Sequence, residues 1–299
     1  MGLTNLAGHE TKANIFVDTL TDLPYSDGEE RANRTVAPII RAGVSGWNHP
    51  QWDRLVFPRP TPTSYHPLDF LSERLDAIEL PDGHAIRPEL AKLYAAKVAR
   101  NPRFQFTARV PEAITMDHNL GTARAWRIGM QPLLEAGRLG CVVLQFPESF
   151  RFTAENREWL IQLRRALAPL PMVADLAHAS WTSTEGRGTL IDYHLGFANA
   201  EDAHTGYLTW KVGYVSAGAH AQESHLYTVG ELEDLRRRME RYAGFSESTF
   251  VIFRNAHRGK SVINALQMQS LVTNFESKLA QPLRIEKRKS VAAAPRRAA

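Results

Sequence analysis

The chain has 299 residues, 43% of them hydrophobic and 23% charged, which is the composition of an ordinary globular protein. This length suits one large α/β barrel or two medium domains. No apolar run approaches the roughly 18 residues of a membrane-spanning helix, and the N-terminus lacks the apolar stretch of a secretory signal. The single cysteine, Cys141, cannot form an intrachain disulfide. These features predict a cytoplasmic protein with no membrane contact.

The net charge of +4 comes mainly from the C-terminal segment, residues 281–299. Six basic residues stand there against one glutamate: Arg284, Lys287, Arg288, Lys289, Arg296 and Arg297. The segment has no apolar periodicity, so we expect a disordered basic tail. A weak contact with nucleic acid through this tail is one interpretation, and a plain solvated tail is the other.

The rest of the chain is expected to form one domain. Residues 1–37 have no strand or helix period and are interpreted as an N-terminal extension, whereas residues 38–280 alternate short apolar runs with helical segments. Eight runs are expected to be strands: Ile39–Val44, Ala77–Leu80, Phe104–Val110, Cys141–Phe146, Met172–Leu176, Leu195–Ala198, Tyr207–Val212 and Thr249–Phe253.

Helical spacing of apolar residues lies between most of these runs. The segments are 68–75, 90–97, 159–167, 232–239 and 261–279, with expected starts at Thr153, Thr228 and Ser261. Eight strands with intervening helices predict an α/β fold, a (βα)8 TIM-type barrel. The connection between the sixth and seventh runs is too short for a full helix.

Polar residues follow the predicted strands. In a parallel barrel the functional site is built at the C-terminal strand ends, and ionisable groups inside apolar strands are costly unless paired. The candidate ligand-binding residues are Ser45, Trp47, Gln145, His178, Lys211, Asn255, His257 and Lys260. The candidate catalytic residues are Glu79, Arg109 and Asp175. A structural ion-pair network is the alternative interpretation of the same residues.

Several short motifs follow one another along the chain. They are Gly43-Val-Ser-Gly-Trp47, Ile78-Glu79, Phe106-Thr-Ala-Arg-Val-Pro111, Leu144-Gln-Phe-Pro147, His178-Ala-Ser-Trp181 and Phe253-Arg-Asn255. In order and spacing the chain resembles the YecE-like family, called domain of unknown function 72, over about residues 39–275. The resemblance implies a TIM-type barrel with a pocket, and the family's name assigns no activity.

The chain departs from the family pattern at several positions in the expected pocket. Arg109 stands in place of a lysine, Asp175 in place of a glutamate and Ala177 in place of an arginine. Trp210 and Val212 replace an arginine and a histidine. An arginine keeps the charge of lysine but cannot act as a general base. The resemblance therefore implies a pocket whose lining has changed.

Two kinds of chemistry fit these candidates. Glu79 and Asp175 would transfer protons while Arg109 stabilises an anionic or carbonyl group. Alternatively, the carboxylates with His84, His178 or His257 would hold a divalent metal, although the sequence has no compact metal motif and we assign no metal ligand. No Gly-x-Ser-x-Gly, CxxC or dinucleotide fingerprint occurs, so the cofactor is unknown.

A further expectation concerns the turn that ends in Gly259-Lys260-Ser261. It follows a strand and precedes a helix, where backbone N–H groups can bind a phosphate or carboxylate. Gly213, Ser216 and Gly218 are expected in a neighbouring loop. The alternative is a simple turn.

Three functions follow from these patterns. The first is an enzyme acting on a small polar or phosphorylated metabolite. The second is a non-catalytic binding or adaptor barrel, and the third is a nucleic-acid-associated protein. The sequence gives no oligomeric state.

Overall fold

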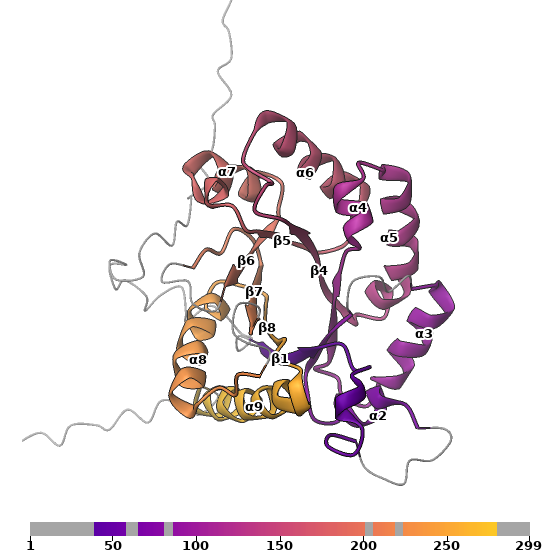
Figure 1. Cartoon of the computed structure of the whole chain (residues 1–299), viewed down its shortest axis with the longest axis vertical. Helices are drawn as coiled ribbons and strands as arrows, with labels where there is room; N and C mark the ends of the chain where they lie inside the picture. The colour runs from indigo at the N-terminus through magenta and orange to yellow at the C-terminus, as the bar shows by residue number, and fades with distance from the viewer. Residues whose placement is uncertain (1–38, 58–64, 81–85, 201–205, 219–223, 280–299) are drawn as a thin grey trace, which may run out of the picture.

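A ring of eight parallel strands encloses the centre of the molecule, and helices surround it (Figure 1). The structure is a computed structural model that describes residues 39–57, 65–80, 86–200, 206–218 and 224–279. The expected N-terminal extension and basic tail lie outside these residues, as does His84. The strands pair in sequence order, and β1 also pairs with β8, which closes the barrel. The predicted (βα)8 barrel is therefore confirmed.

The strands are β1 (Ile40–Ser45), β2 (Ala77–Leu80), β3 (Gln105–Arg109), β4 (Leu139–Phe146), β5 (Met172–Leu176), β6 (Gly196–Ala200), β7 (Val212–Ala217) and β8 (Ser248–Phe253). The α-helices are α2 (Pro67–Ser72), α3 (Pro88–Lys97), α4 (Glu112–Met116), α5 (Leu120–Glu135), α6 (Ala154–Ala166), α7 (Thr184–Asp192), α8 (Val229–Ala243) and α9 (Lys260–Leu279). Three short 3-10 helices are η1 (Pro50–Trp52), η2 (Ala179–Thr182) and η3 (His257–Gly259).

Side chains alternate between the two faces of each strand, as period-two geometry requires. Ala77 of β2 packs inside the barrel, whereas its neighbour Ile78 packs in the larger core between strands and helices. The interior contains mainly apolar residues: Ala77, Cys141, Val143, Val173, Ala198, Val212, Tyr214, Phe250 and Ile252. Glu79 shares the inward face of β2 with Ala77. The predicted core position of Cys141 is confirmed.

Two helix starts follow the expected capping chemistry. Thr153 accepts a hydrogen bond from the backbone N–H of Asn156, and Thr228 forms a capping box with Glu231. The third expected start differs by one residue, because α9 begins at Lys260.

The seventh strand differs from its prediction. The expected run was 207–212, whereas β7 is Val212–Ala217. Aromatic residues made the earlier segment similar to a strand, while Gly213 and Ser216 made the true strand similar to a loop. Position 213 inside the sheet favours a glycine, because a Cβ there would lie only 2.9 Å from Oγ1 of Thr249. Residues 206–211 contain no helix, as expected for this connection.

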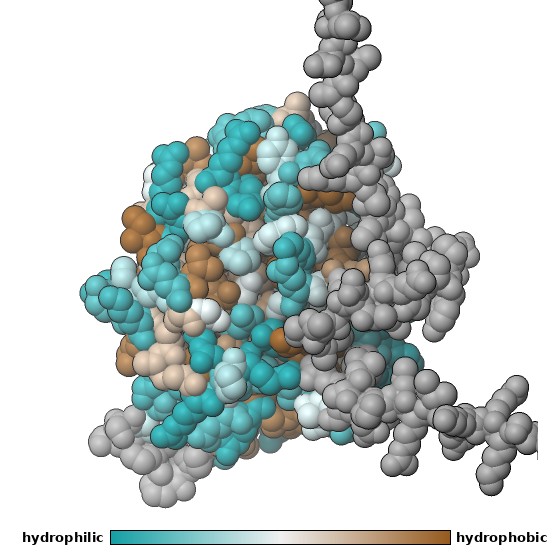
Figure 2. Space-filling model, turned by 180° about the vertical axis from the view of Figure 1, so that it is seen from behind, coloured by the Kyte–Doolittle hydropathy of each residue, from teal (hydrophilic) through white to brown (hydrophobic). Residues whose placement is uncertain are grey.

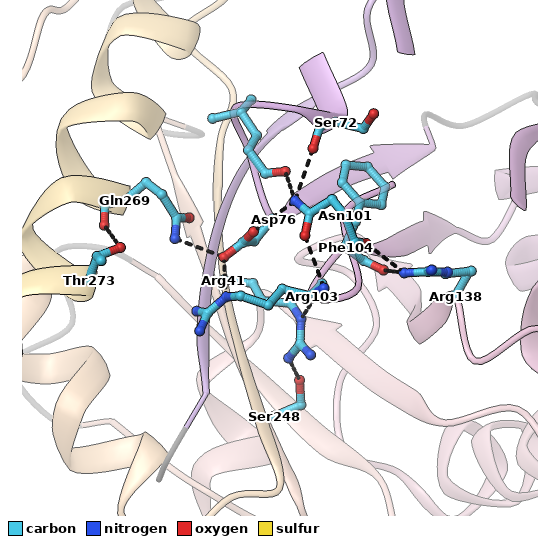
Figure 3. A network of polar contacts seen from close by, with 11 residues as sticks. Arg41, Ser72, Asp76, Asn101, Arg103, Phe104, Arg138, Ser248, Gln269 and Thr273 are labelled. Carbon is cyan, nitrogen blue, oxygen red and sulfur yellow. Dashed lines mark hydrogen bonds and ion pairs between the residues drawn. The ribbon is translucent and has the colours of Figure 1, made fainter. Parts of the chain in front are cut away.

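A polar network ties together the N-terminal ends of the strands (Figure 3). Asp76 precedes β2, is 6% exposed, and accepts hydrogen bonds from Asn101 (3.0 Å), Arg103 (2.8 Å) and Gln269 (2.8 Å). Arg41 of β1 donates to the carbonyl of Arg103. These contacts join β1, the starts of β2 and β3, and α9. The network lies at the end of the barrel opposite to the candidate site.

Figure 2 shows a face on which hydrophilic residues predominate, with smaller hydrophobic patches among them. Among the described residues, no helix combines the length and apolar character needed to cross a membrane.

Candidate functional site

Glu79 lies at the floor of the mouth formed by the C-terminal strand ends. Its side chain is 0% exposed, and its register partners are Ser45 of β1 and Thr107 of β3. A buried carboxylate is stable only where hydrogen bonds or opposite charges replace its lost water. The structure supplies both.

Four side chains from four other parts of the barrel reach the Glu79 carboxylate. Ser45 donates to Oε1 at 2.9 Å, and Nη2 of Arg109 lies 3.8 Å from the same oxygen. The Tyr214 hydroxyl donates to Oε2, and Nη2 of Arg254 donates to Oε2 at 2.8 Å. Both oxygens of Glu79 are therefore engaged.

Burial raises the pKa of Glu79 above its ordinary value, while Arg109 and the hydrogen bonds from Tyr214 and Ser45 act in the opposite direction. Arg254, closer than Arg109, acts in that direction too, because a nearby cation favours the ionised carboxylate. The pKa of Tyr214 is raised well above its ordinary value by burial and then by Glu79. Tyr214 consequently remains a hydrogen-bond donor at neutral pH.

Tyr214 and Arg254 were missed as site residues in the sequence. The misplaced seventh strand hid Tyr214, which lies in the middle of β7. Arg254 follows Phe253 at the end of β8 and continues the inward alternation of Phe250 and Ile252. Counting every second residue from those two would have placed Arg254 at the mouth.

Arg109 connects the buried floor to a pocket. Its side chain is 22% exposed, and its Nε atom is buried without a hydrogen-bond partner among the described residues. The pocket measures about 320 Å³ and is lined by Arg109, Val110, Glu112, Met116, Gln145, Phe146, Pro147 and Ala177. Backbone and side chains from β3, α4, β4 and the end of β5 thus enclose it. Ala177 stands where the family resemblance implies an arginine, and it contributes only a methyl group to the wall of the pocket.

Gln145 and Asp175 are direct neighbours on β4 and β5. They are register partners, so their side chains share the inward face of the sheet. Gln145 is exposed at the mouth and Asp175 is half-buried. The structure therefore brings together Ser45, Glu79, Arg109, Gln145 and Asp175 at one end of the barrel.

Trp47 and His178, which were also predicted to bind a ligand, are engaged in contacts with their neighbours. Trp47 is 8% exposed, and its ring packs edge-on against Tyr94 at a centroid distance of 5.3 Å. His178 caps η2 and contacts the Ser180 hydroxyl at 2.8 Å through Nδ1. Both residues hold loops in place around the mouth.

Lys211 lies at the wrong end of the barrel for a mouth residue. It directly precedes β7, and it is exposed and paired with Glu247. The expectation that it follows a strand was wrong because the strand begins one residue after it. Lys211 is therefore removed from the candidate site.

The backbone N–H groups of the turn after β8 are already engaged in hydrogen bonds. Backbone N–H groups of Arg258, Gly259 and Ser261 donate to Gln51, to the carbonyl of Ala256 and to the carbonyl of Asn255. The N–H of Lys260 donates to the carbonyl of His257, and its Nζ atom donates to Ser224. These four N–H groups cannot bind an anion without breaking the turn. The expected anion site at 259–261 is therefore not supported.

Asn255 and His257 serve this same turn. Asn255 is 0% exposed and donates to the carbonyl of His225 at 2.7 Å and to Asn264 at 3.0 Å. His257 begins η3 and is half-buried. The neighbouring segment was expected to be a loop that helps to bind an anion, but Gly213 and Ser216 lie inside β7. The Ser216 hydroxyl accepts a hydrogen bond from Nε of Arg254 at 2.6 Å.

The described residues contain no group of three or more histidine, cysteine, aspartate or glutamate side chains that could hold a metal ion. In this part of the chain, Glu79 is surrounded by cations and hydroxyl groups, which are not metal ligands of the kind a carboxylate site gathers.

Comparison with known proteins agrees with this architecture. A DUF72 family protein from Thermotoga maritima is 22% identical, with a TM-score of 0.65, and covers 79% of this chain and 99% of its own. A DUF72 family protein from Enterococcus faecalis is 20% identical, with a TM-score of 0.64, and covers 79% and 98%. No curated protein matches the chain.

The closed ring of strands with its polar mouth defines a TIM-type barrel protein. The model of the family described as protein of unknown function DUF72 matches residues 41–288, so the chain belongs to that family.

Proposed function

We propose that the mouth of this barrel binds a small polar ligand through an anionic group held by Arg109. The observation that carries the proposal is the position of the Arg109 side chain, which lines the pocket and is 22% exposed. An arginine presents N–H donors in a planar fork that matches carboxylate and phosphate groups. A bound anion would accept hydrogen bonds from the terminal N–H groups of this guanidinium.

The pocket is suited to a small ligand. A volume of about 320 Å³ is near the lower end of small-molecule sites. Gln145 offers both a donor and an acceptor, and Glu112 offers an acceptor to a hydroxyl or amino group. Val110, Met116 and Phe146 provide the apolar part of the wall. The ligand class is therefore a small carboxylate or phosphate ester that carries further polar groups.

Glu79 positions the cations of this site. Since both of its oxygens accept hydrogen bonds or face a cation, it could take up a substrate proton only after losing one of these contacts. Its buried charge instead orients Arg109 and Arg254. Asp175, half-buried beside Gln145, is the second candidate catalytic carboxylate at this end of the barrel. This arrangement favours ligand binding as the primary function over acid–base catalysis by Glu79.

A thermal-shift experiment with defined anions tests the proposal. Malate, citrate, glycerol 3-phosphate and ribose 5-phosphate are titrated into the wild type, Arg109→Gln and Arg100→Gln. Arg100 is a suitable control because its side chain is 89% exposed and lies outside the pocket. We expect at least one compound to raise the Tm of the wild type and of Arg100→Gln, but not of Arg109→Gln.

A second measurement covers ligands outside this panel. Small molecules released on denaturation of purified wild type and Arg109→Gln are compared by mass spectrometry. A compound retained by the wild type alone supports the proposal. Equal behaviour of the two proteins in both experiments overturns it.

A further inference from the structure

A second polar depression lies on the outer wall of the barrel, between α5 and α6, which are neighbours in the ring of helices (Figure 1). Its volume is about 220 Å³, and its lining residues are Leu120, Arg124, Arg127, Gln162, Arg165 and Ala166. It shares no lining residue with the pocket at the mouth. We call it the α5–α6 groove.

The groove gathers positive charge without a carboxylate partner. Within the described part of the chain, Arg124, Arg127 and Arg165 have no carboxylate oxygen within 4 Å. Arg103 and Arg254, in contrast, are paired with Asp76 and Glu79. Three like charges around one hollow repel each other, and a bound anion would relieve that repulsion.

Two of the three arginines are held by contacts that leave donors available. Nη1 of Arg127 donates to the carbonyl of Ala168 at 2.6 Å, and the guanidinium of Arg165 lies 6.0 Å from the ring centroid of Tyr193. Each guanidinium has five N–H donors, so the hydrogen bond from Arg127 to Ala168 leaves most of its donors for a ligand. Gln162 adds a carboxamide, anchored by its bond to Glu158 at 3.2 Å.

We propose that the α5–α6 groove binds a phosphate group. Three cations on two helices exceed what one carboxylate can satisfy, whereas a phosphate has three terminal oxygens and up to two negative charges. The phosphate can belong to inorganic phosphate or a small ester, or to a nucleic-acid strand. This proposal is independent of the function assigned to the mouth.

The test uses Arg109→Gln as the parent protein, so that anion binding by Arg109 at the mouth is removed before the groove is examined. Inorganic phosphate is titrated by calorimetry at low ionic strength into full-length Arg109→Gln and into Arg109→Gln with Arg127→Gln and Arg165→Gln. We expect phosphate affinity to fall at least about tenfold in the triple variant, because two charge-assisted contacts are lost. Equal affinity in the two proteins overturns the proposal.

Two controls separate binding from folding and from general charge. Arg109→Gln with Arg100→Gln and Arg237→Gln removes the same charge from exposed sites outside the groove and should retain the affinity. Arg109→Gln with Arg127→Lys and Arg165→Lys should bind with an intermediate affinity, since lysine keeps the charge but not the fork. Loss of affinity in the exposed-site control equal to that in the groove variant also overturns the proposal.

A competition arm identifies the source of the phosphate. The single-stranded oligonucleotide dT8 is added to Arg109→Gln in the presence of inorganic phosphate. Displacement of phosphate that depends on Arg127 and Arg165 assigns the groove to a nucleic-acid strand. Phosphate binding that dT8 leaves unchanged assigns it to free phosphate or a small ester.

Discussion

Arg254 places Nη2 2.8 Å from Oε2 of Glu79, although 175 positions separate the two residues in the chain. The contact joins the segment after β8 to β2 across the barrel interior. Glu79 is 0% exposed and the Arg254 side chain is 13% exposed, so this ion pair is shielded from water. Removing one partner of such a pair leaves an uncompensated charge, which costs more than a surface pair would.

Arg254→Met should therefore lower the free energy of unfolding by about 3 kcal/mol at neutral pH. The loss should be larger at pH 8 than at pH 5, because the variant raises the pKa of Glu79 further. A folded state that holds a proton which the unfolded state has released loses stability as pH rises. Urea unfolding at both pH values measures the effect. An equal loss at pH 5 and pH 8 would contradict this reasoning.

Tyr214→Phe removes the hydroxyl that donates to Glu79 and should cost about 2 kcal/mol at pH 7. It should also change the alkaline limb of the stability curve. Since burial and Glu79 raise the pKa of Tyr214, the unfolded tyrosine ionises near pH 10 while the folded one stays protonated. Wild-type stability should fall above about pH 10, and the fall should be shallower in Tyr214→Phe. Urea midpoints from pH 7 to pH 11 test this, and parallel curves would refute it.

Asp76→Ala should lower the free energy of unfolding by about 3 kcal/mol, because three partly buried donors lose their buried acceptor at once. Asp234→Ala is the matched control, since Asp234 is exposed and pairs with Arg237 of its own helix, and it should cost less than about 1 kcal/mol. Chemical denaturation compares the two. If both variants lose the same stability, the network in Figure 3 does not carry the role given to it.

Gly43→Ala should strongly destabilise the barrel, whereas Gly188→Ala should not. A Cβ at Gly43 would lie 2.1 Å from the carbonyl oxygen of Ala77, which is backbone of the paired strand β2. A Cβ at Gly188, inside α7, has no atom within 4 Å, so alanine there should add up to about 1 kcal/mol through helix propensity. Thermal unfolding of the two variants measures the contrast. A stable Gly43→Ala protein would show that β1 and β2 can separate.

The barrel could be predicted because the sequence patterns that indicate its strands are local. Ala77–Leu80 and Met172–Leu176 are short apolar runs, and the structure gives the same bounds to β2 and β5. The seventh strand was missed because Gly213 is there for packing, which a local pattern does not record. The helices α5 and α7 were not identified from the apolar spacing.

The candidate site was predictable in position but not in its contacts. Glu79, Arg109, Gln145 and Asp175 follow from the rule that barrel sites form at C-terminal strand ends. That both oxygens of Glu79 are already engaged depends on Tyr214 and Arg254, which come from distant parts of the chain. Sequence spacing also could not show that the N–H groups of Arg258 and Gly259 already donate to the Gln51 side chain and to the carbonyl of Ala256.

The engagement of Glu79 by several strands also matters for redesign of the pocket. A change at Glu79 would disturb the barrel wall and the ligand site together, so variants selected for a new ligand would unfold before they could be assayed. Glu112, Met116 and Gln145 line the pocket without contacting that carboxylate in any described interaction. A library restricted to these three positions would explore new specificities while the scaffold keeps its stability.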